Sequence, residues 1–315
     1  MLAFPAIHTQ PYPILNTKSM RSYARLFFWL TLCGLSPQAL AQSPAVENAV
    51  FWEISANGLS KPSYLFGTFH LKGSTYVDSL THVIAKFKSS GTMVGELLFD
   101  STMTVKVMTA SIMKDTTLDM LLSREHFQQT AAWLKELTGY DLKMFNKMNP
   151  MMVEILIMST LQQKYFPAPA NDRPMDLYFQ QRAKTEGKKM IGLESFDEQI
   201  NALYNQFSYK RQADMLMDFV LEKDRAKSDV VNMNRYYREG NLGQLESMMT
   251  RQVFSEKETD VLVNDRNRKW MTQLPALMKE QQTFIAVGAL HLAGENGLVT
   301  LLRKAGYVVK PVRML

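Results

Sequence analysis

Two distant segments of the chain share one order of elements, and this repeat limits the fold more than any other feature of the sequence. Residues 63–67 (SYLFG) form an apolar strand that runs into GTFH at 67–70, and residues 283–288 (TFIAVG) run into GALH at 288–291. After each motif, apolar residues recur with i, i+3, i+4, i+7 spacing, which predicts an amphipathic helix. A second apolar segment follows each helix. The repeat predicts two β-α-β units in a mixed sheet with parallel pairs.

The rest of the chain adds further elements to this mixed α/β fold. The strands that complete the two units are predicted at 92–98 and 307–312. A related strand at 189–193 leads directly into Glu194. An S-x-x-E capping box at 195–198 then predicts the start of another helix.

The long stretches between these strands carry helical periodicity. They cover about 101–186 and 208–280, and we expect them to form a helical insertion that covers the sheet. No Gly/Ser tract or low-complexity linker divides the chain after the first 41 residues. Residues 42–315 are therefore expected to form a single domain.

The first 41 residues have the three-part layout of a secretory signal peptide. Two arginines precede an apolar run at 26–35, and Ala39-Leu40-Ala41 supplies a small-x-small cleavage site. The apolar run is too short to span a bilayer. Met20 is an alternative start, because the polar stretch before it fits poorly in a signal. We expect a periplasmic or secreted protein, cleaved near Ala41/Gln42, with no membrane span left after cleavage.

Loss of this segment changes the charge and the cysteine count. The segment holds three basic residues, no acidic residue and Cys33, the only cysteine. Without it, 33 basic residues face 30 acidic ones, so the net charge falls from +6 to +3. The remaining Lys and Arg form no dense run, and a nucleic-acid partner is not indicated. With no thiolate available, any metal must be held by histidines and carboxylates.

Two of the four histidines that remain stand out by their motifs. His70 and His291 each follow a strand, with Gly three residues before and Leu directly after. His82 and His126 lie off the apolar stripes of their helices and are expected at the surface. The carboxyl ends of parallel strands converge on one crevice, and two imidazoles with one carboxylate form an open metal site. In the alternative, each histidine is a core residue bonded to a backbone carbonyl.

Two glutamates are the candidate partners of these histidines. Glu96 lies in an apolar strand, where an ionised carboxylate is costly unless it is paired or bound to metal; in a half-exposed strand it would simply face water. Glu194 lies beside a helix N-terminus, where its alternative role is to stabilise the helix dipole. If His70, His291 and Glu96 hold a divalent metal, water there becomes a nucleophile near neutral pH. Glu194 would then take the proton, or the two glutamates would exchange roles.

Several motifs, taken in this order, resemble the TraB/GumN family, which is related to the Tiki metalloproteases. They are GTFH at 67–70, Gly-Glu at 95–96, GLES at 192–195, DRN at 265–267 and GALHLAGENGLVTLLRKAGY at 288–307. The resemblance extends over about 51–309, nearly the whole chain after the signal. It implies a mixed α/β fold like that of the erythromycin-esterase and ChaN-like proteins.

The resemblance also assigns individual residues. It implies a divalent-metal site at His70, Glu96 and His291, occupied by Mn, Co or Zn. Arg266 and Asn267 match a family Arg-Asn pair that contacts substrate or the surroundings of the metal. Asp176 matches another family acid, although a helix N-cap is the alternative explanation for an aspartate at that place.

Together these features predict an exported, metal-dependent hydrolase. The Tiki resemblance implies a metallopeptidase, with a peptide or small molecule as substrate. The alternative is a non-catalytic periplasmic protein that binds a metal, haem or a peptide on the same fold.

Overall fold

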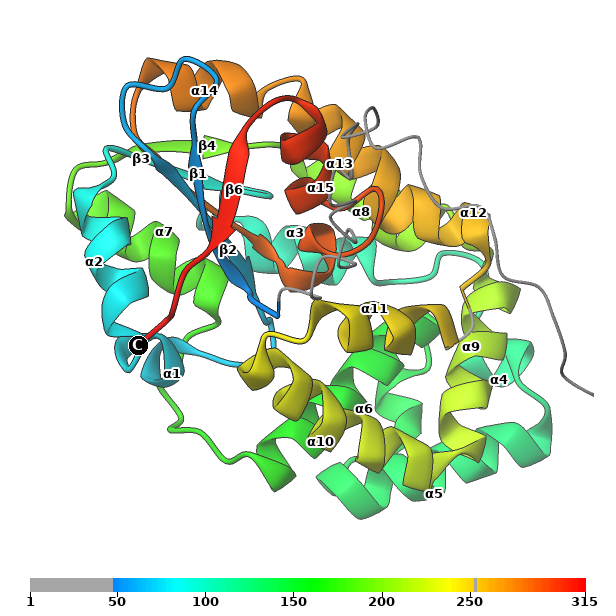
Figure 1. Ribbon diagram of the computed structural model, residues 1–315. Coiled ribbons are helices and arrows are strands. Elements are labelled where there is room, and N and C mark those ends of the chain that lie inside the picture. Colours follow the sequence, from blue (N-terminus) through cyan, green and yellow to red (C-terminus); the bar gives the residue numbers. More distant parts are fainter. Residues whose placement is uncertain (1–47, 252–253) are drawn as a thin grey trace, which may run out of the picture. The chain divides into compact units, whose positions relative to one another are not determined.

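Six strands form one mixed sheet in the order β4-β3-β5-β2-β1-β6. This computed structural model describes residues 48–251 and 254–315, so the predicted signal peptide lies outside the described residues (Figure 1). The bounds of the strands are Phe51–Ser55 for β1, Ser63–Thr68 for β2, Thr92–Gly95 for β3, Lys189–Gly192 for β4, Thr283–Gly288 for β5 and Val308–Pro311 for β6. The mixed α/β class predicted from the sequence is confirmed.

Four neighbouring strands of the sheet are parallel. β3 pairs with β4 and with β5, and β5 pairs with β2, all in the same direction. The register places Gly95 of β3 opposite Ala286 of β5, and Thr68 of β2 opposite Gly288 at the end of β5. These four strands therefore end along one edge of the sheet, where the residues that follow them meet.

The position of the last strand differs from the prediction. β6 does not extend a parallel pair; it lies at the far edge, antiparallel to β1, which is itself antiparallel to β2. The reason is β1, a strand that the sequence analysis missed, whose Phe51, Trp52 and Ile54 are buried. The connection from β5 through α15 to β6 therefore passes over two strands. Asn57-Gly58, between β1 and β2, is a hairpin signal that would have revealed β1.

The helices lie between the strands in four groups. Between β2 and β3 are α1 (Ser74–Asp78) and α2 (Thr81–Ser89). Between β3 and β4 are α3 (Met103–Ala110), α4 (Leu118–Leu121), α5 (Arg124–Thr138), η1 (Leu142–Phe145), α6 (Pro150–Tyr165) and α7 (Met175–Thr185). Between β4 and β5 are α8 (Phe196–Ile200), η2 (Asn201–Asn205), α9 (Tyr209–Leu221), α10 (Lys223–Glu239), α11 (Leu242–Arg251), α12 (Glu256–Thr259), η3 (Asp260–Asn264), α13 (Asp265–Met271) and α14 (Leu274–Glu280). After β5 come η4 (Ala289–Leu292) and α15 (Leu298–Lys304).

Local sequence signals fix several of these helix ends. Ser123 caps α5 by accepting a hydrogen bond from the His126 backbone N–H, and Gly139 ends that helix with a φ of 79°. The capping box predicted at 195–198 is present at the start of α8. Such caps satisfy the backbone groups that a helix terminus leaves unpaired. In the described ranges, no helix is both long and apolar enough to cross a membrane.

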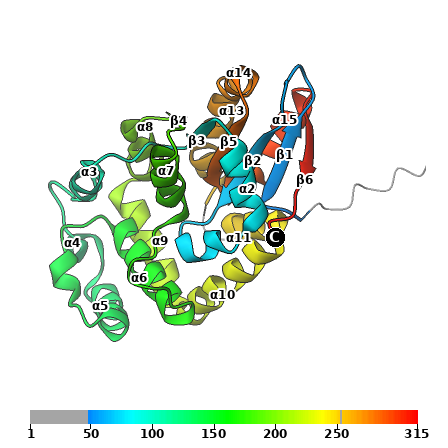
Figure 2. The same ribbon diagram turned by 90° about the vertical axis from the view of Figure 1, so that its left-hand side faces the viewer.

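Helices cover both faces of the sheet and also form a second layer. Figure 1 shows α2 and α7 on one face, and α13, α14 and α15 on the other. α5, α6, α9 and α10 gather on the side toward which the parallel strands end, as Figure 1 and Figure 2 show in two views at right angles. Two clusters of buried side chains result, one around the sheet and one among these helices. Met233 of α10 packs against both clusters.

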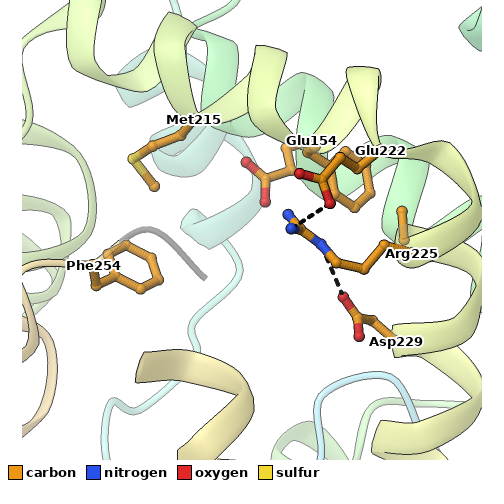
Figure 3. A pocket seen from close by; sticks show the side chains of 8 residues that line it. Glu154, Met215, Glu222, Arg225, Asp229 and Phe254 are labelled. Atoms are coloured by element: carbon orange, nitrogen blue, oxygen red, sulfur yellow. Dashed lines mark ion pairs between the residues drawn. The ribbon is translucent and has the colours of Figure 1, made fainter. Parts of the chain in front are cut away.

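A cavity of about 40 Å³ lies within the helical layer (Figure 3). Its wall includes Glu154 of α6, Phe254, and Arg225 of α10, which forms ion pairs with Glu222 and Asp229. Glu154 is only partly exposed. Burial, and then the nearby charge of Asp218, raise the pKa of Glu154 to about 7. The folded chain therefore holds a proton on Glu154 that the unfolded chain releases at lower pH.

Replacing Glu154 with glutamine is expected to stabilise the protein increasingly as the pH rises. With the folded-state pKa raised, the wild-type loses stability between about pH 4.5 and pH 7, because the unfolded chain binds fewer protons there. We expect an advantage of about 1–2 kcal/mol at pH 8, below the ~3 kcal/mol of the full shift because solvent screens the carboxylate. Urea denaturation at pH 5 and pH 8 measures it. The exposed Glu136→Gln on α5 is the control, and equal effects of both variants would contradict the prediction.

Candidate functional site

The residues proposed from the sequence follow four adjacent parallel strands. Glu194 comes two residues after β4, Glu96 directly after β3, His291 in η4 after β5, and His70 two residues after β2. They come together because side chains at the carboxyl ends of neighbouring parallel strands face one crevice. Asp176 enters the same region from the first turn of α7.

Glu96 lies just outside its strand, not within it as the sequence analysis expected. The strand β3 ends at Gly95, although the Glu194 N–H still donates to the Glu96 carbonyl. Just beyond, the Gln180 side chain of α7 binds the Leu97 carbonyl and the Phe99 N–H. The Glu96 side chain is 10% exposed, which excludes the alternative that it faces open water. Its Oε1 accepts a hydrogen bond of 2.7 Å from the Gly288 N–H.

Three side chains border one small space beside Gly288. A methyl group placed on the Cα of Gly288 would lie 3.2 Å from Glu96 Oε1, 3.6 Å from His70 Nε2 and 3.6 Å from His291 Cδ2. Only glycine leaves this space open. The cavity that His70, Glu96 and Asp176 line together measures about 30 Å³, which is room for a water molecule or an ion.

Each imidazole is held by its Nδ1 atom. His70 Nδ1 lies 2.8 Å from Asp176 Oδ2, while Asp176 Oδ1 accepts a hydrogen bond from the Thr68 hydroxyl. His291 Nδ1 lies 2.8 Å from Asn267 Oδ1. An Nδ1–H that donates to such an oxygen leaves the Nε2 lone pair free, which is the arrangement found behind metal-bound histidines.

The two partner residues therefore act on the histidines. Asp176 is not the N-cap of α7, since Pro174 holds that position. The Asn267 side chain is fully buried, and its amide hydrogens are donated to the carbonyls of His291 and Asn296. Asn267 thus lies behind His291, on the side away from the shared space.

Arg266 of α13 connects both glutamates and His291. Its guanidinium donates to Glu194 Oε1 and Oε2 at 2.6 and 3.0 Å, and to Glu96 Oε2 at 2.6 Å. Its Nη1 lies 3.1 Å from His291 Nε2. All of these side chains are close to fully buried. Both oxygens of Glu194 are occupied by Arg266, whereas Oε1 of Glu96 still faces the shared space.

The surroundings set the charges of these groups. Burial lowers the pKa of His291 to about 3, so its ring is neutral near pH 7. Burial alone would raise the pKa of Glu96, but the positive charges of His291, when protonated, of Arg266 and of His70 lower it, together with the hydrogen bond from Gly288. Near pH 7, where His291 is neutral, Arg266 and His70 still lower the pKa of Glu96. Asp176 raises the pKa of His70, and water around this ring, which is 67% exposed, weakens the effect.

Negative charge exceeds positive charge at the site. Metal binding requires both imidazoles to be neutral, so the proton that Asp176 favours on His70 must leave. In that state three carboxylates (Glu96, Glu194 and Asp176) face one guanidinium, which leaves two negative charges uncompensated. Burial raises the pKa of Glu194, although Arg266 opposes this effect. A divalent cation would neutralise the excess.

The donor set fits a divalent metal, although it is not yet arranged around one. Within residues 48–251 and 254–315, no three His, Cys, Asp or Glu side chains already form a metal-holding group. Arg266 Nη1 lies 3.1 Å from His291 Nε2 and would compete with a metal for that nitrogen. His70 Nε2, the His291 ring and Glu96 Oε1 nevertheless border one space, and His291 Nε2 lies 3.8 Å from Glu96 Oε1. Two imidazoles and a carboxylate are the ligand types of an open zinc- or manganese-type site.

Comparison with known proteins places the chain in a family. A family model described as TraB/PrgY/gumN matches residues 50–311. The chain belongs to this family. The chain is also 25% identical over 244 residues to the uncharacterized protein YbaP of Shigella flexneri, which covers 78% of this chain and 89% of the relative. YbaP of Escherichia coli strain K12 is 25% identical over 240 residues, with 76% and 87% covered. No solved structure matches the chain at a significant level.

Three residues at this TraB/PrgY/gumN site were missed from the sequence. Trp270 is fully buried, and its ring lies 4.3 Å from the His291 ring. Gln199 of α8 donates to Glu96 Oε2 at 3.4 Å. Tyr237 of α10 donates to the Gly67 carbonyl at 2.7 Å and so ties the helical layer to the end of β2. Trp270 lies four residues after Arg266, one helical turn away, which was a signal in the sequence.

Proposed function

We propose that this TraB/PrgY/gumN-family protein is an exported hydrolase that uses a divalent metal held by His70, His291 and Glu96. The observation that supports the proposal is the approach of His70 Nε2, the His291 ring and Glu96 Oε1 to one space beside Gly288. Both histidines are oriented from behind by oxygen acceptors. We also propose that the fold is arranged as in the erythromycin-esterase and ChaN-like proteins.

We assign different roles to the residues around this space. A bound divalent cation would polarise water and lower its pKa toward neutrality. Glu96 Oε1 is placed either to bind the cation or to accept the proton, whereas Glu194 is committed to Arg266. Arg266, held by Glu194, supplies a fixed positive charge for negative charge that develops on a substrate carbonyl. The structure favours Glu96 over Glu194 for direct chemistry.

Metal content and cleavage test the proposal together. The full chain would be purified, incubated with Mn²⁺, Co²⁺ or Zn²⁺, and assayed for bound metal and for cleavage of a peptide library before and after chelation. We expect stoichiometric metal in the wild-type, and binding weakened by more than about 100-fold in His70→Ala and His291→Ala, since loss of an outer partner alone typically costs 10- to 100-fold. His82→Ala on α2, exposed and outside the site, is the control. A wild-type chain that binds none of the three metals would refute the proposal.

Glu96→Gln separates the two roles of this glutamate. If Glu96 is a ligand, the variant loses both metal and activity. If Glu96 accepts the proton, the variant keeps its metal and loses cleavage. Metal binding by the wild-type without any cleavage would instead support the alternative, a periplasmic protein that binds a metal, haem or a peptide without turnover.

A further inference from the structure

A groove of about 310 Å³ begins at His70 and leads away from the shared space. It is bounded by the loop His70–Gly73, by the last turns of α6 (Ser159, Gln162 and Gln163), and by the segment Ala168–Pro174. The space beside Glu96 is roughly ten times smaller. If the reacting bond of a substrate lies at His70, this groove therefore has room for the part of the substrate next to that bond.

The groove carries a cation without a carboxylate partner. The Lys72 ammonium lies 4.7 Å from the centre of the Tyr76 ring and 5.7 Å from that of Phe166. No carboxylate of the described residues lies within ion-pair distance of it. Aromatic rings attract a neighbouring cation but do not neutralise its charge. Lys72 is thus a positioned positive charge two residues from His70.

Arg238 strengthens this positive charge. It is exposed in the last turn of α10 and does not itself line the groove, but its charge acts on both Lys72 and Tyr76. Two like charges placed together are unfavourable unless an anion joins them.

The other walls of the groove supply one negative charge, that of Asp172. Asp172 lines the groove, but its Oδ1 accepts hydrogen bonds from the Ser74 hydroxyl and from the N–H and hydroxyl of Thr75, so it is committed to the start of α1. Gln162 pairs with Asn234, and Gln163 binds the backbone of Ala168. Lys72 and Arg238 therefore outnumber the single carboxylate of Asp172, and the amide side chains of Gln162 and Gln163 add no charge.

We propose that this groove binds the part of the substrate next to the reacting bond and selects a carboxylate there, through Lys72 and Arg238. The inference rests on the proposed function of the neighbouring site. Because two residues of extended chain span about 7 Å, the carboxylate would lie one or two residues from the bond. It would be either the C-terminus of a peptide or the side chain of an Asp or Glu.

Peptide binding to the metal-free full chain tests this inference without any need for catalysis. Three fluorescent peptides of equal length are compared by anisotropy: tri-alanine with a free C-terminus, tri-alanine amide, and Ala-Glu-Ala amide. We expect one or both charged peptides to bind at least about 10-fold more tightly than tri-alanine amide, an electrostatic preference that salt reduces. The peptide that binds identifies the source of the carboxylate.

Variants locate the preference in the groove. Lys72→Gln should abolish the difference between charged and neutral peptides, and Lys72→Arg should keep it. Lys61→Gln, at an exposed lysine between β1 and β2, is the matched control and should bind like the wild-type. Arg238→Gln, at an exposed position, should fold like the wild-type and reduce the preference in part. It replaces Lys72→Gln as the test if that variant does not fold.

The inference would be overturned if the wild-type bound the three peptides equally or bound none of them. It would also be overturned if the preference for a charged peptide survived in both Lys72→Gln and Arg238→Gln. These results are independent of the proposed function, which fails instead if the wild-type binds no metal. A chain that binds metal but prefers neutral peptides would support the proposed metal site and refute the proposed role of the groove.

Discussion

Replacing Arg266 with methionine is expected to lower the free energy of unfolding of the metal-free protein by about 3–5 kcal/mol near pH 7. The variant leaves the carboxylates of Glu96 and Glu194 buried without their shared cation. A buried charge that loses its partner keeps the full cost of its desolvation, which is why the expected loss is large. Methionine retains most of the length of the apolar stem but removes the guanidinium, which lies 5.0 Å from the centre of the Trp270 ring.

Arg268→Met is the matched control, two residues away on the same helix. Arg268 is 48% exposed and pairs with Asp265 at the surface, so its loss should cost less than about 1 kcal/mol. Urea denaturation of both variants gives the comparison. If a divalent metal binds where we propose, saturating metal should stabilise Arg266→Met more than the wild-type, because no guanidinium competes for His291. Equal losses for the two arginines would show that Arg266 does not carry the buried charge.

Gly288→Ala is expected to weaken metal binding by at least about 10-fold while the chain stays folded, because metal–ligand distances near 2 Å leave no room for an added carbon. The new methyl group would lie in the space that His70, His291 and Glu96 border. Its 3.2 Å approach to Glu96 Oε1 requires that carboxylate to move by a few tenths of an ångström. The backbone of Gly288 has φ −53° and ψ 138°, which alanine adopts without strain, so the effect is confined to the site.

Two further glycines serve as controls for this substitution. A methyl group on Gly95, at the end of β3, would make only ordinary contacts, the closest at 3.4 Å, so Gly95→Ala should retain metal. A methyl group on Gly67 would lie 2.9 Å from the Ala289 Cα, so Gly67→Ala should destabilise the fold itself. Metal analysis and thermal melting measured together separate the two effects. If Gly288→Ala bound metal as fully as the wild-type, the metal site would have to lie elsewhere in the protein.

The paired histidines were predictable because a strand-end position is a property of local sequence. GTFH and GALH each follow an apolar strand, and the rule that parallel strands end at one edge then brings His70 and His291 together. The sequence also indicated Glu96, because a charge in an apolar segment needs a partner. The helix caps at Ser123 and Gly139 were predictable for the same local reason.

The contacts that the sequence did not reveal are those made across the fold. Arg266 was indicated only by a family motif, and its bonds to both glutamates depend on how α13 packs against the sheet. Asp176 also depends on packing, because the start of α7 must reach the end of β2. The place of β6 could not follow from its own residues, since it depends on β1, which has no counterpart in the repeat.

The position of β5 has a consequence for the order in which the protein can form. This strand lies between β3 and β2 and hydrogen-bonds to both, yet it is made almost last. Until residues 283–288 leave the ribosome, β2 and β3 have no strand to join them, and His70 has no partner histidine. Pairing of such distant segments slows folding, because the loop must close before any contact forms. A chain that stops short of β5 would therefore lack the middle of its sheet as well as half of its paired motif.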